Sequence, residues 1–211
     1  MITGKPLSYG GSVGRDRATA RGGFFILREL AGIEAIDMRE LRVAIQGFGN
    51  AGSEMAIFLH NAGANVVAIS DSHGGIYSKA GLDPIRIQKE KRKTGEVTGL
   101  YCKGSVCDLE RMKHDQAEII TNEQLLEIDC DVLVPAALDN VITETNAKKI
   151  KAKIILELAN GPVSPEADKI LYKNGVTVVP DVLANAGGVT VSYFEWVQGR
   201  SGDDWTEDRV E

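Results

Sequence analysis

Three glycines spaced as Gly47-x-Gly49-x-x-Gly52 are the residues of this chain whose spacing points most directly to a chemical task. An apolar segment, 41–46, runs directly into them, and a helical pattern, 50–63, runs out of them. In that setting the first glycine permits a tight turn, the second lets a pyrophosphate approach the backbone, and the third lets the helix pack against the strand. The amide groups that begin the helix, at its positive dipole end, would hold the phosphates. The residues predicted to bind a dinucleotide at this turn are Gly47, Phe48, Gly49, Asn50, Ala51 and Gly52.

Asp71 ends the next apolar segment, 64–70, and lies 19 residues after Gly52. An acidic residue in this position accepts hydrogen bonds from the adenosine ribose of a bound cofactor. Its carboxylate would repel a 2′-phosphate, which favours NAD over NADP. Ser72 and His73 follow at once and could soften that preference, so NADP stays open, and Ser72 is assigned to the cofactor as well. The alternative, that Asp71 only begins a turn before "SHGG", is weaker because the glycines are correctly placed.

The cysteines and histidines do not form a pattern typical of a disulfide framework or a metal site. Three cysteines, at positions 102, 107 and 130, are odd in number and lack CxxC spacing, which fits a reducing cytoplasm. Cys102 and Cys107 lie in one loop-like stretch, so their pairing on oxidation stays a minor alternative. The three histidines are scattered, each without a second metal-type ligand nearby, and no metal is predicted.

The elements that must position these residues alternate between strand and helix. The strands are short, continuously apolar and rich in Val and Ile, which is typical of parallel strands covered on both faces. The sequence therefore predicts an α/β fold with a doubly wound, mostly parallel sheet of the Rossmann type. The expected strands are 41–46, 64–70, 117–120, 130–136, 153–159 and 176–181, and the expected helices are 14–31, 50–63, 83–93, 122–128, 143–152 and 164–175.

Local signals refine two of these segments and predict one turn between them. Thr143 is a candidate N-cap for the helix that it begins. The stretch "HGGIY", 73–77, predicts a turn. Gly22 and Gly23 weaken the helix 14–31 and indicate that another element packs close to its backbone.

The composition excludes several classes of partner. A net charge of −6 and a pI of about 5.2 argue against nucleic acid, because phosphate binding needs clustered Lys and Arg. The one basic run, 86–93, also contains Glu90 and is interpreted as the solvated face of a helix. No stretch approaches the roughly 18 apolar residues of a membrane span, and the first residues lack the apolar core of a secretory signal. We therefore expect a cytoplasmic protein without a membrane partner.

Six separated stretches resemble one family, in order and in spacing. They are "SVGRDRATARG" (12–22), "VAIQGFGNAG" (43–52), "SDSHGGIY" (70–77), "LVPAAL" (133–138), "ELANGP" (157–162) and "LANAGGVTVSYFEW" (183–196). Together they resemble the coenzyme-binding half of glutamate dehydrogenase, of the hexameric bacterial and archaeal type. The resemblance implies an NAD(P)-dependent oxidoreductase and one dinucleotide-binding domain over 1–211. Within it, 1–13 would lead into the domain and 197–211 would be a truncated C-terminal segment.

The resemblance also implies cofactor contacts outside the glycine turn. The counterparts of Arg15 and Thr19 face the cleft from one helical face, and the Thr19 hydroxyl would bond the nicotinamide carboxamide. The backbone around Ala136 and Ala137 would pass beside the ribose and the nicotinamide. Asn160 would bond the nicotinamide side of the cofactor.

In the stretch 183–196, the resemblance implies that Asn185 reaches the carboxamide of the nicotinamide. It assigns Val189 and Ser192 to the substrate pocket. Ser192 would donate to the side-chain carboxylate of glutamate. Read without the resemblance, Asn185 is equally a turn residue and Ser192 a satisfied helix hydroxyl. Structural roles alone are assigned to Phe194, Glu195 and Trp196.

The resemblance further implies that the catalytic groups lie elsewhere. The family's catalytic Lys, in a "GGxKGG"-like stretch, and its catalytic Asp belong to an N-terminal substrate domain, and this chain has no such stretch. Oxidative deamination of L-glutamate to 2-oxoglutarate and ammonia needs an acid and a base in a closed, dry cleft. We therefore expect no catalytic residue here, with NAD binding but little or no turnover. The full enzyme would be a homohexamer assembled through its substrate domain, and this chain a monomer or weak dimer.

Two alternatives remain. A leucine- or phenylalanine-type amino-acid dehydrogenase has an apolar pocket, in which an unpaired Ser192 hydroxyl would cost about 1–3 kcal/mol. A stand-alone, non-catalytic nucleotide-sensing module would not need a substrate-facing wall such as Arg15, Thr19, Asn185 and Ser192 provide.

Overall fold

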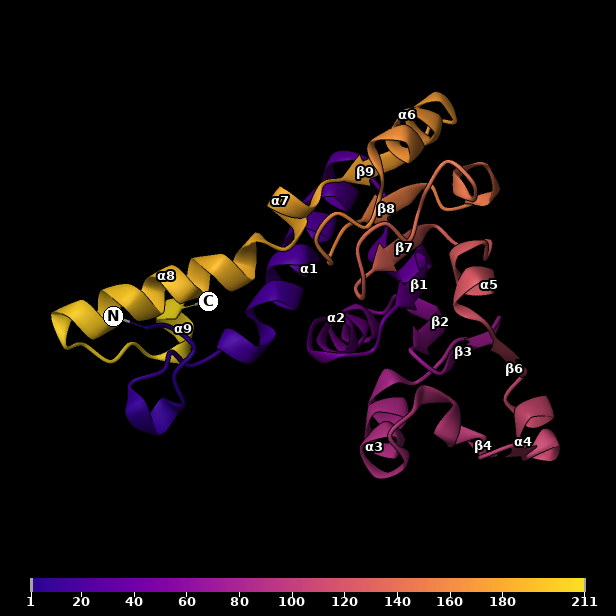
Figure 1. Ribbon diagram of the computed structural model, residues 1–211, viewed down its shortest axis with the longest axis horizontal. Helices are drawn as coiled ribbons and strands as arrows, with labels where there is room; N and C mark the ends of the chain where they lie inside the picture. Colours follow the sequence, from indigo (N-terminus) through magenta and orange to yellow (C-terminus); the bar gives the residue numbers. More distant parts are fainter. Residues whose placement is uncertain (1, 211) are drawn as a thin grey trace.

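Seven short apolar segments form one sheet in the computed structural model, which describes residues 2–210 (Figure 1). Across the sheet the strands are β6 (Ala117–Ile120), β3 (Gly74–Ser78), β2 (Asn65–Asp71), β1 (Arg42–Gln46), β7 (Val132–Pro135), β8 (Ile154–Leu156) and β9 (Thr177–Val179). Adjacent strands run parallel except at β3, which is antiparallel to both of its neighbours. β1 lies between β2 and β7, so the chain winds outward from it in both directions. The predicted doubly wound, mostly parallel α/β fold is confirmed.

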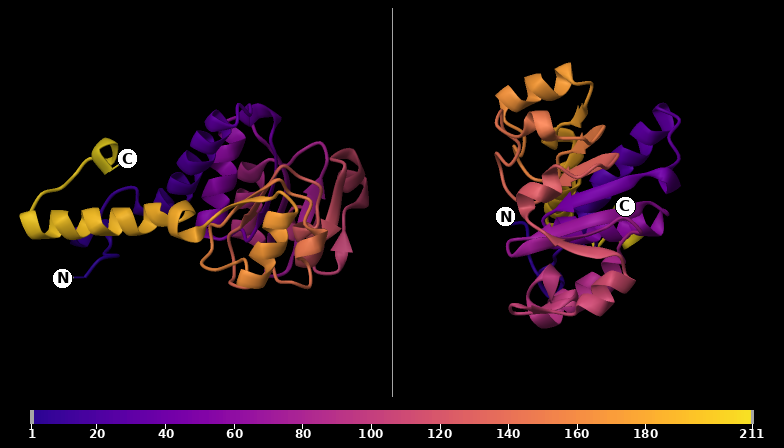
Figure 2. Two further views of the ribbon diagram at one scale, coloured as in Figure 1. Left: turned by 90° about the horizontal axis from the view of Figure 1, so that it is seen from above. Right: turned by 90° about the vertical axis from the view of Figure 1, so that its right-hand side faces the viewer.

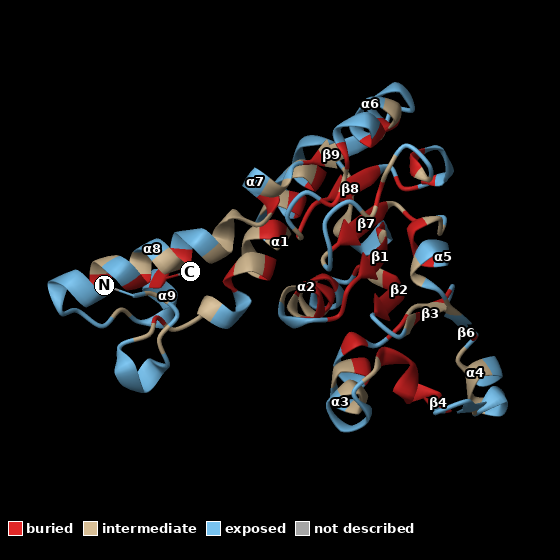
Figure 3. Cartoon of the chain, viewed as in Figure 1, coloured by how far each residue is buried: buried red, intermediate tan, exposed pale blue. Residues whose placement is uncertain are grey.

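Helices cover both faces of the sheet. The helices are α1 (Arg15–Ile33), α2 (Asn50–Asn61), α3 (Pro84–Thr94), α4 (Leu109–His114), α5 (Asn122–Leu126), α6 (Pro165–Lys173), α7 (Asp181–Ala184), α8 (Ala186–Ser201) and α9 (Glu207–Val210). Successive residues of a strand point to opposite faces. Val43 and Ile45 of β1 join a core cluster with side chains of α1, α2 and α3, whereas Ala44 joins a second cluster with α5 and α6. The strands are therefore buried from both sides, as their continuous apolar character predicts (Figure 3).

Helix α8, α9 and the N-terminal segment, residues 2–14, extend together away from the sheet (Figures 1 and 2). Helices α8 and α9 share a small apolar cluster with the start of α1. Ala18, Val191 and Val210 are its buried residues, and Phe194 and Trp205 pack against them with their ring centroids 5.5 Å apart. This part of the molecule is therefore joined to the sheet chiefly through α1.

Helices α1 and α8 cross with almost no side chain between them. A Cβ atom added to Gly187 would lie 2.1 Å from the carbonyl oxygen of Ala18, and one added to Gly22 would lie 3.0 Å from the backbone of Gly187. A Cβ on Gly23 would lie 2.8 Å from Met55 Cε. The close packing that the two glycines of α1 predict is therefore present.

Two local expectations differ from the structure. The stretch 73–77 is mostly strand, because the turn lies at Ser72 and His73 and Gly74–Ser78 forms strand β3, which pairs with β2 through this short hairpin. The segment 143–152 is not an α-helix capped by Thr143, and only Ala147–Lys149 makes a short 3-10 turn. Here the Asn146 side chain accepts from the amide of Thr143 and donates to the carbonyl of Val141, so local side-chain bonds replace helical ones.

A second, two-stranded sheet joins two cysteines. Strands β4 (Cys102–Lys103) and β5 (Val106–Cys107) pair with Cys102 opposite Cys107, and a disulfide links them. This pairing was only a minor alternative in the sequence analysis, because spacing alone does not show that the stretch forms a hairpin that brings the two side chains together. Cys130 is free and buried, and burial raises the pKa of its thiol to about 12.

No helix between residues 2 and 210 is long and apolar enough to cross a membrane. Within the same residues, His, Cys, Asp and Glu side chains do not gather in a group of three or more that could hold a metal ion.

The substitution Gly187→Ala tests the close crossing of α1 and α8. We expect it to lower the free energy of unfolding by about 2 kcal/mol, because the new methyl group meets backbone that cannot move unless the helices separate. Chemical denaturation followed by circular dichroism measures the change. The matched control is Gly32→Ala in α1, where a Cβ meets nothing within 4 Å. It should be neutral or stabilise by up to about 1 kcal/mol, and a similar loss in both variants would contradict the packing described here.

Candidate functional site

The glycine turn connects β1 to α2 as the sequence predicts. Gly47 has a φ of +94°, and its amide donates to the carbonyl of Ser70 in β2 at 3.0 Å. A Cβ on Gly52 would lie 1.8 Å from the carbonyl oxygen of Gly47, so only glycine fits there. Gly49 differs, because a Cβ added to it would meet nothing within 4 Å. It is the N-cap of α2 and has no capping side chain, so the first amides of the helix are open to a ligand.

A cavity of about 750 Å³ lies beside this turn, at the carboxyl ends of β1, β2 and β7. That edge, at the strand where the winding reverses, is where α/β sheets bind ligands. The predicted cofactor residues that line it are Gly47, Phe48, Gly49, Asp71, Ser72, Ala136 and Ala137. The structure thus brings together residues from three strands that are far apart in sequence. Gln46 also lines this cavity, and its buried Oε1 has no hydrogen-bond partner among the described residues.

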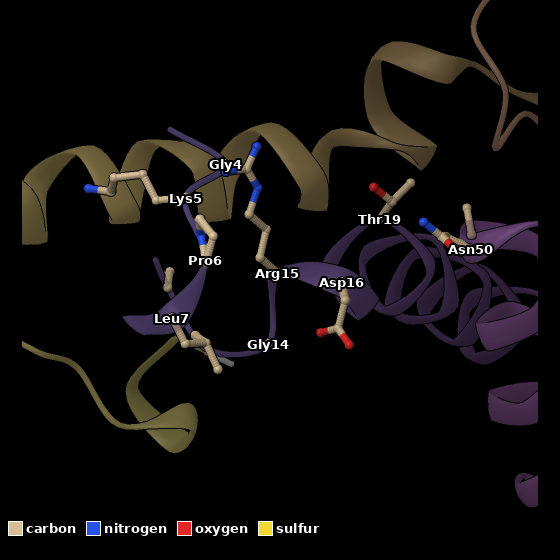
Figure 4. Close-up of a pocket in the computed structure, with 11 residues that line it drawn as sticks. Gly4, Lys5, Pro6, Leu7, Gly14, Arg15, Asp16, Thr19 and Asn50 are labelled. Atoms are coloured by element: carbon tan, nitrogen blue, oxygen red, sulfur yellow. The ribbon is translucent and has the colours of Figure 1, made fainter. Parts of the chain in front are cut away.

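A second cavity, of about 660 Å³, lies on the other side of the turn (Figure 4). It is lined by the N-terminal segment and by the first turns of α1 and α2. Arg15, Thr19, Asn50 and Ala51 line this cavity, so eleven of the sixteen predicted residues are divided between two cavities, seven in the first and four in the second. Figure 4 shows Thr19 and Asn50 near one another, on α1 and α2 respectively.

Asp71 is 7% exposed, and both oxygens of its carboxylate are occupied. Oδ1 accepts from the amide of His73 at 2.9 Å, and Oδ2 accepts from Lys91 Nζ at 2.5 Å and from the amide of Val97 at 2.8 Å. Burial raises the pKa of Asp71, but the hydrogen bond from Lys91 and those from the two amides outweigh it and leave the pKa below its ordinary value. Asp71 is therefore ionised at neutral pH.

Lys91 is a residue of this site that the sequence did not predict. It belongs to the basic run 86–93, which the sequence assigns to a solvated helix face, and half of the residues of that run are exposed. Lys91 lies 20 residues after Asp71, and only the tertiary packing of α3, which contacts α2 and the 3-10 turn Val97–Leu100, brings the two together. The spacing of the two residues in the sequence does not predict such an ion pair.

Glu195, on α8, has a fully buried carboxylate. The sequence assigned it only a structural role, and the structure shows several contacts that define this role. Glu195 accepts from the amide of Gly4 at 2.9 Å and from that of Lys5 at 3.1 Å. Arg15 Nη1 lies 2.5 Å from its Oε2, and Lys5 Nζ lies 3.9 Å from its Oε1. Glu195 thus ties the N-terminal segment, α1 and α8 together, and the Arg15 guanidinium is directed toward it.

The remaining predicted residues lie outside both cavities. Asn185 Nδ2 donates to Asn160 Oδ1 at 2.7 Å, so these two, 25 residues apart, are brought together. Val189 is 70% exposed on α8. The Ser192 hydroxyl donates to the carbonyl of Gly188 at 2.9 Å, which is the satisfied state that the sequence left open.

The two aromatic residues assigned to packing differ from one another. Phe194 packs against Trp205, whereas Trp196 is 37% exposed and stacks on Tyr193 at a centroid distance of 6.0 Å. The guanidinium of Arg200 lies 5.0 Å from the centre of the Trp196 ring. The packing role is therefore confirmed for Phe194 alone.

Comparison with known proteins decides the family. The model of the glutamate/leucine/phenylalanine/valine dehydrogenase family matches residues 10–211. The chain belongs to this family.

Relatives within the glutamate/leucine/phenylalanine/valine dehydrogenase family match along the whole chain. The chain is 51% identical over 211 residues to the cryptic catabolic NAD-specific glutamate dehydrogenase GudB of Bacillus subtilis. It is 48% identical over 210 residues to the NAD-specific glutamate dehydrogenase of Staphylococcus aureus. The two alignments cover all of this chain but 46% and 47% of those relatives. The chain thus spans about half the length of the curated relatives it matches.

Solved structures of family members share the fold. The hetero-hexameric glutamate dehydrogenase of Thermus thermophilus, in its Leu-bound form, matches with a TM-score of 0.86 at 33% identity, over 99% of this chain and 46% of that one. The glutamate dehydrogenase of Peptoniphilus asaccharolyticus matches with a TM-score of 0.76 at 36% identity, over 99% of this chain and 45% of that one.

The substitution Arg15→Met tests the role of the buried carboxylate of Glu195. It removes a charged hydrogen bond to a group without access to water, so the free energy of unfolding should fall by about 2 kcal/mol. Arg17→Met is the matched control, because Arg17 pairs with Glu54 at 3.4 Å and is half exposed, a type of pair worth under about 1 kcal/mol. Equal losses in the two variants, measured by urea denaturation, would show that Glu195 does not depend on Arg15.

Proposed function

We propose that this chain is the coenzyme-binding domain of a glutamate dehydrogenase and that it binds NAD. The observation that carries the proposal is the cavity at the carboxyl ends of β1, β2 and β7, bounded by the glycine turn and by Asp71. The family and the NAD-specific relatives support it. In the whole enzyme, NAD would accept the hydride released when L-glutamate is oxidised to 2-oxoglutarate and ammonia.

The residues present fit a dinucleotide. The open space at Gly49 is where a pyrophosphate would approach the backbone, and the first amides of α2 would donate to it. Asp71 would accept from the hydroxyls of the adenosine ribose, and Ser72 beside it would add a polar contact. Because Asp71 is ionised, a 2′-phosphate would be repelled by it, which supports NAD as the preferred cofactor.

We assign the nicotinamide end to the residues beyond β7. The backbone around Ala136 and Ala137 would lie beside the nicotinamide ribose, and the pair Asn160 and Asn185 would offer amide groups to the carboxamide. Thr19, on α1, would add its hydroxyl. The roles of the first four residues rest on the family resemblance and on their positions beyond the carboxyl ends of the strands, and that of Thr19 rests on the resemblance and on its position in the second cavity.

We assign the substrate side to α8. Val189 is exposed on this helix, and Ser192 would donate to the side-chain carboxylate of glutamate. To do so, its hydroxyl would turn away from the carbonyl of Gly188, to which it now donates. We propose no catalytic residue in this chain, because the lysine and the aspartate that the family uses as base and acid have no counterpart here.

The domain proposal covers the whole chain. We take 1–211 as one dinucleotide-binding domain, with 1–13 leading into it and 197–211 as its C-terminal segment. The whole enzyme would assemble as a homohexamer, and this chain alone would be a monomer or weak dimer.

Titration calorimetry with the substitution Gly49→Ala tests NAD binding at the glycine turn. The wild-type chain should bind NAD, and the variant should bind it at least about tenfold more weakly, because the new methyl group occupies the space needed by the pyrophosphate. The melting temperature should not change, because that methyl group meets nothing in the free protein. Gly32→Ala, which also adds a methyl group in open space but on α1, should bind NAD like the wild type. A wild-type chain that does not bind NAD would contradict the proposal.

The same preparation tests the expected lack of turnover. With saturating glutamate and NAD, NADH should form no faster in the presence of the protein than in a control without it. The measurement is the rate of increase in NADH absorbance. Turnover at a rate typical of dehydrogenases, on the order of 10 s⁻¹, would contradict it.

A further inference from the structure

The ion pair between Lys91 and Asp71 lies at the ribose end of the cavity described above. Lys91 Nζ is 2.5 Å from Asp71 Oδ2, and the side chains are 26% and 5% exposed. Both residues line the cavity, as does Ser72. Lys91 is the only cation among the described residues that line it, and the acids there are Asp71 and Glu123.

This pair changes the charge that a bound ribose would meet. A carboxylate offers about four lone pairs, and Asp71 already uses three, for Lys91 and for the amides of His73 and Val97. The negative charge that would repel a 2′-phosphate therefore has a positive charge next to it. The Lys91 ammonium has three donors, so after its bond to Asp71 two remain for a phosphate oxygen.

We propose that Lys91 is a specificity-determining residue, which offsets the charge of Asp71 and thereby lets the cavity accept the 2′-phosphate of NADP as well as the ribose of NAD. The inference rests on the proposed function, since it concerns the same cofactor site. Asp71 alone would make the site strongly selective for NAD. With Lys91 beside it, the selectivity is a balance between the two side chains.

The neighbouring lysines of α3 do not share this position. Lys93 is exposed and pairs with Glu90 at 2.9 Å, and Lys89 is exposed and lies outside the residues that line the cavity. Because Lys89 is in the same helix and has the same charge, it offers a matched control. An effect of Lys91 that depended only on the net charge of α3 would also appear on replacing Lys89.

Titration calorimetry of NAD and of NADP against four forms of the full chain tests the proposal: the wild type, Lys91→Met, Lys91→Arg and Lys89→Met. The wild type should bind both cofactors, with NADP weaker. Lys91→Met should weaken NADP binding at least about tenfold and leave NAD binding within about threefold of the wild type or tighter. Lys91→Arg, which keeps the charge, and Lys89→Met should both keep the wild-type ratio of the two affinities. Retained NAD binding shows in each case that the variant is folded.

Three results would overturn the proposal. The first is an unchanged ratio of affinities in Lys91→Met, and the second is an equal change in Lys89→Met. The third is a wild-type chain that binds NADP more than about a thousandfold more weakly than NAD, because Lys91 would then not offset Asp71. All three leave NAD binding, and so the proposed function, intact. A wild-type chain that binds neither cofactor would instead remove the proposed function, and this inference with it.

Discussion

The contact between Gly47 and Gly52 is the constraint on which the rest of this molecule depends. A Cβ on Gly52 would lie 1.8 Å from the carbonyl oxygen of Gly47, so helix α2 can follow β1 this closely only with glycine in that position. The close approach directs the first amides of α2 over the carboxyl ends of β1, β2 and β7. The cavity and the open space at Gly49 follow from that direction, and the pairing of β2 with β1 places Asp71 at the edge of the same cavity.

A second region is held by a buried charge rather than by glycine. Glu195 binds two amides of the N-terminal segment and the guanidinium of Arg15, and so fixes α8 relative to α1. Gly187 allows the same two helices to meet backbone to backbone. One end of the proposed cofactor site is thus formed by the sheet, and the other by helices that extend away from it (Figure 2).

The sequence was most informative where a local rule has a unique structural cause. The glycine turn, the covered strands and the close packing at Gly22 each follow from a steric or periodic requirement. The sequence could not predict Lys91 or the burial of Glu195, because those pairings join segments 20 and 180 or more residues apart through tertiary packing. The prediction of a helix at 143–152 was wrong for a local reason, because the side chain of Asn146 competes for the backbone groups that a helix needs.

A crystal structure of the chain grown with NAD tests the central claim most directly. The account predicts electron density for the pyrophosphate beside Gly49, within hydrogen-bond distance of the first amides of α2, and for the adenosine ribose beside Asp71. Density for the dinucleotide away from the edge formed by β1, β2 and β7, or no density in that cavity at a saturating concentration of NAD, would contradict it.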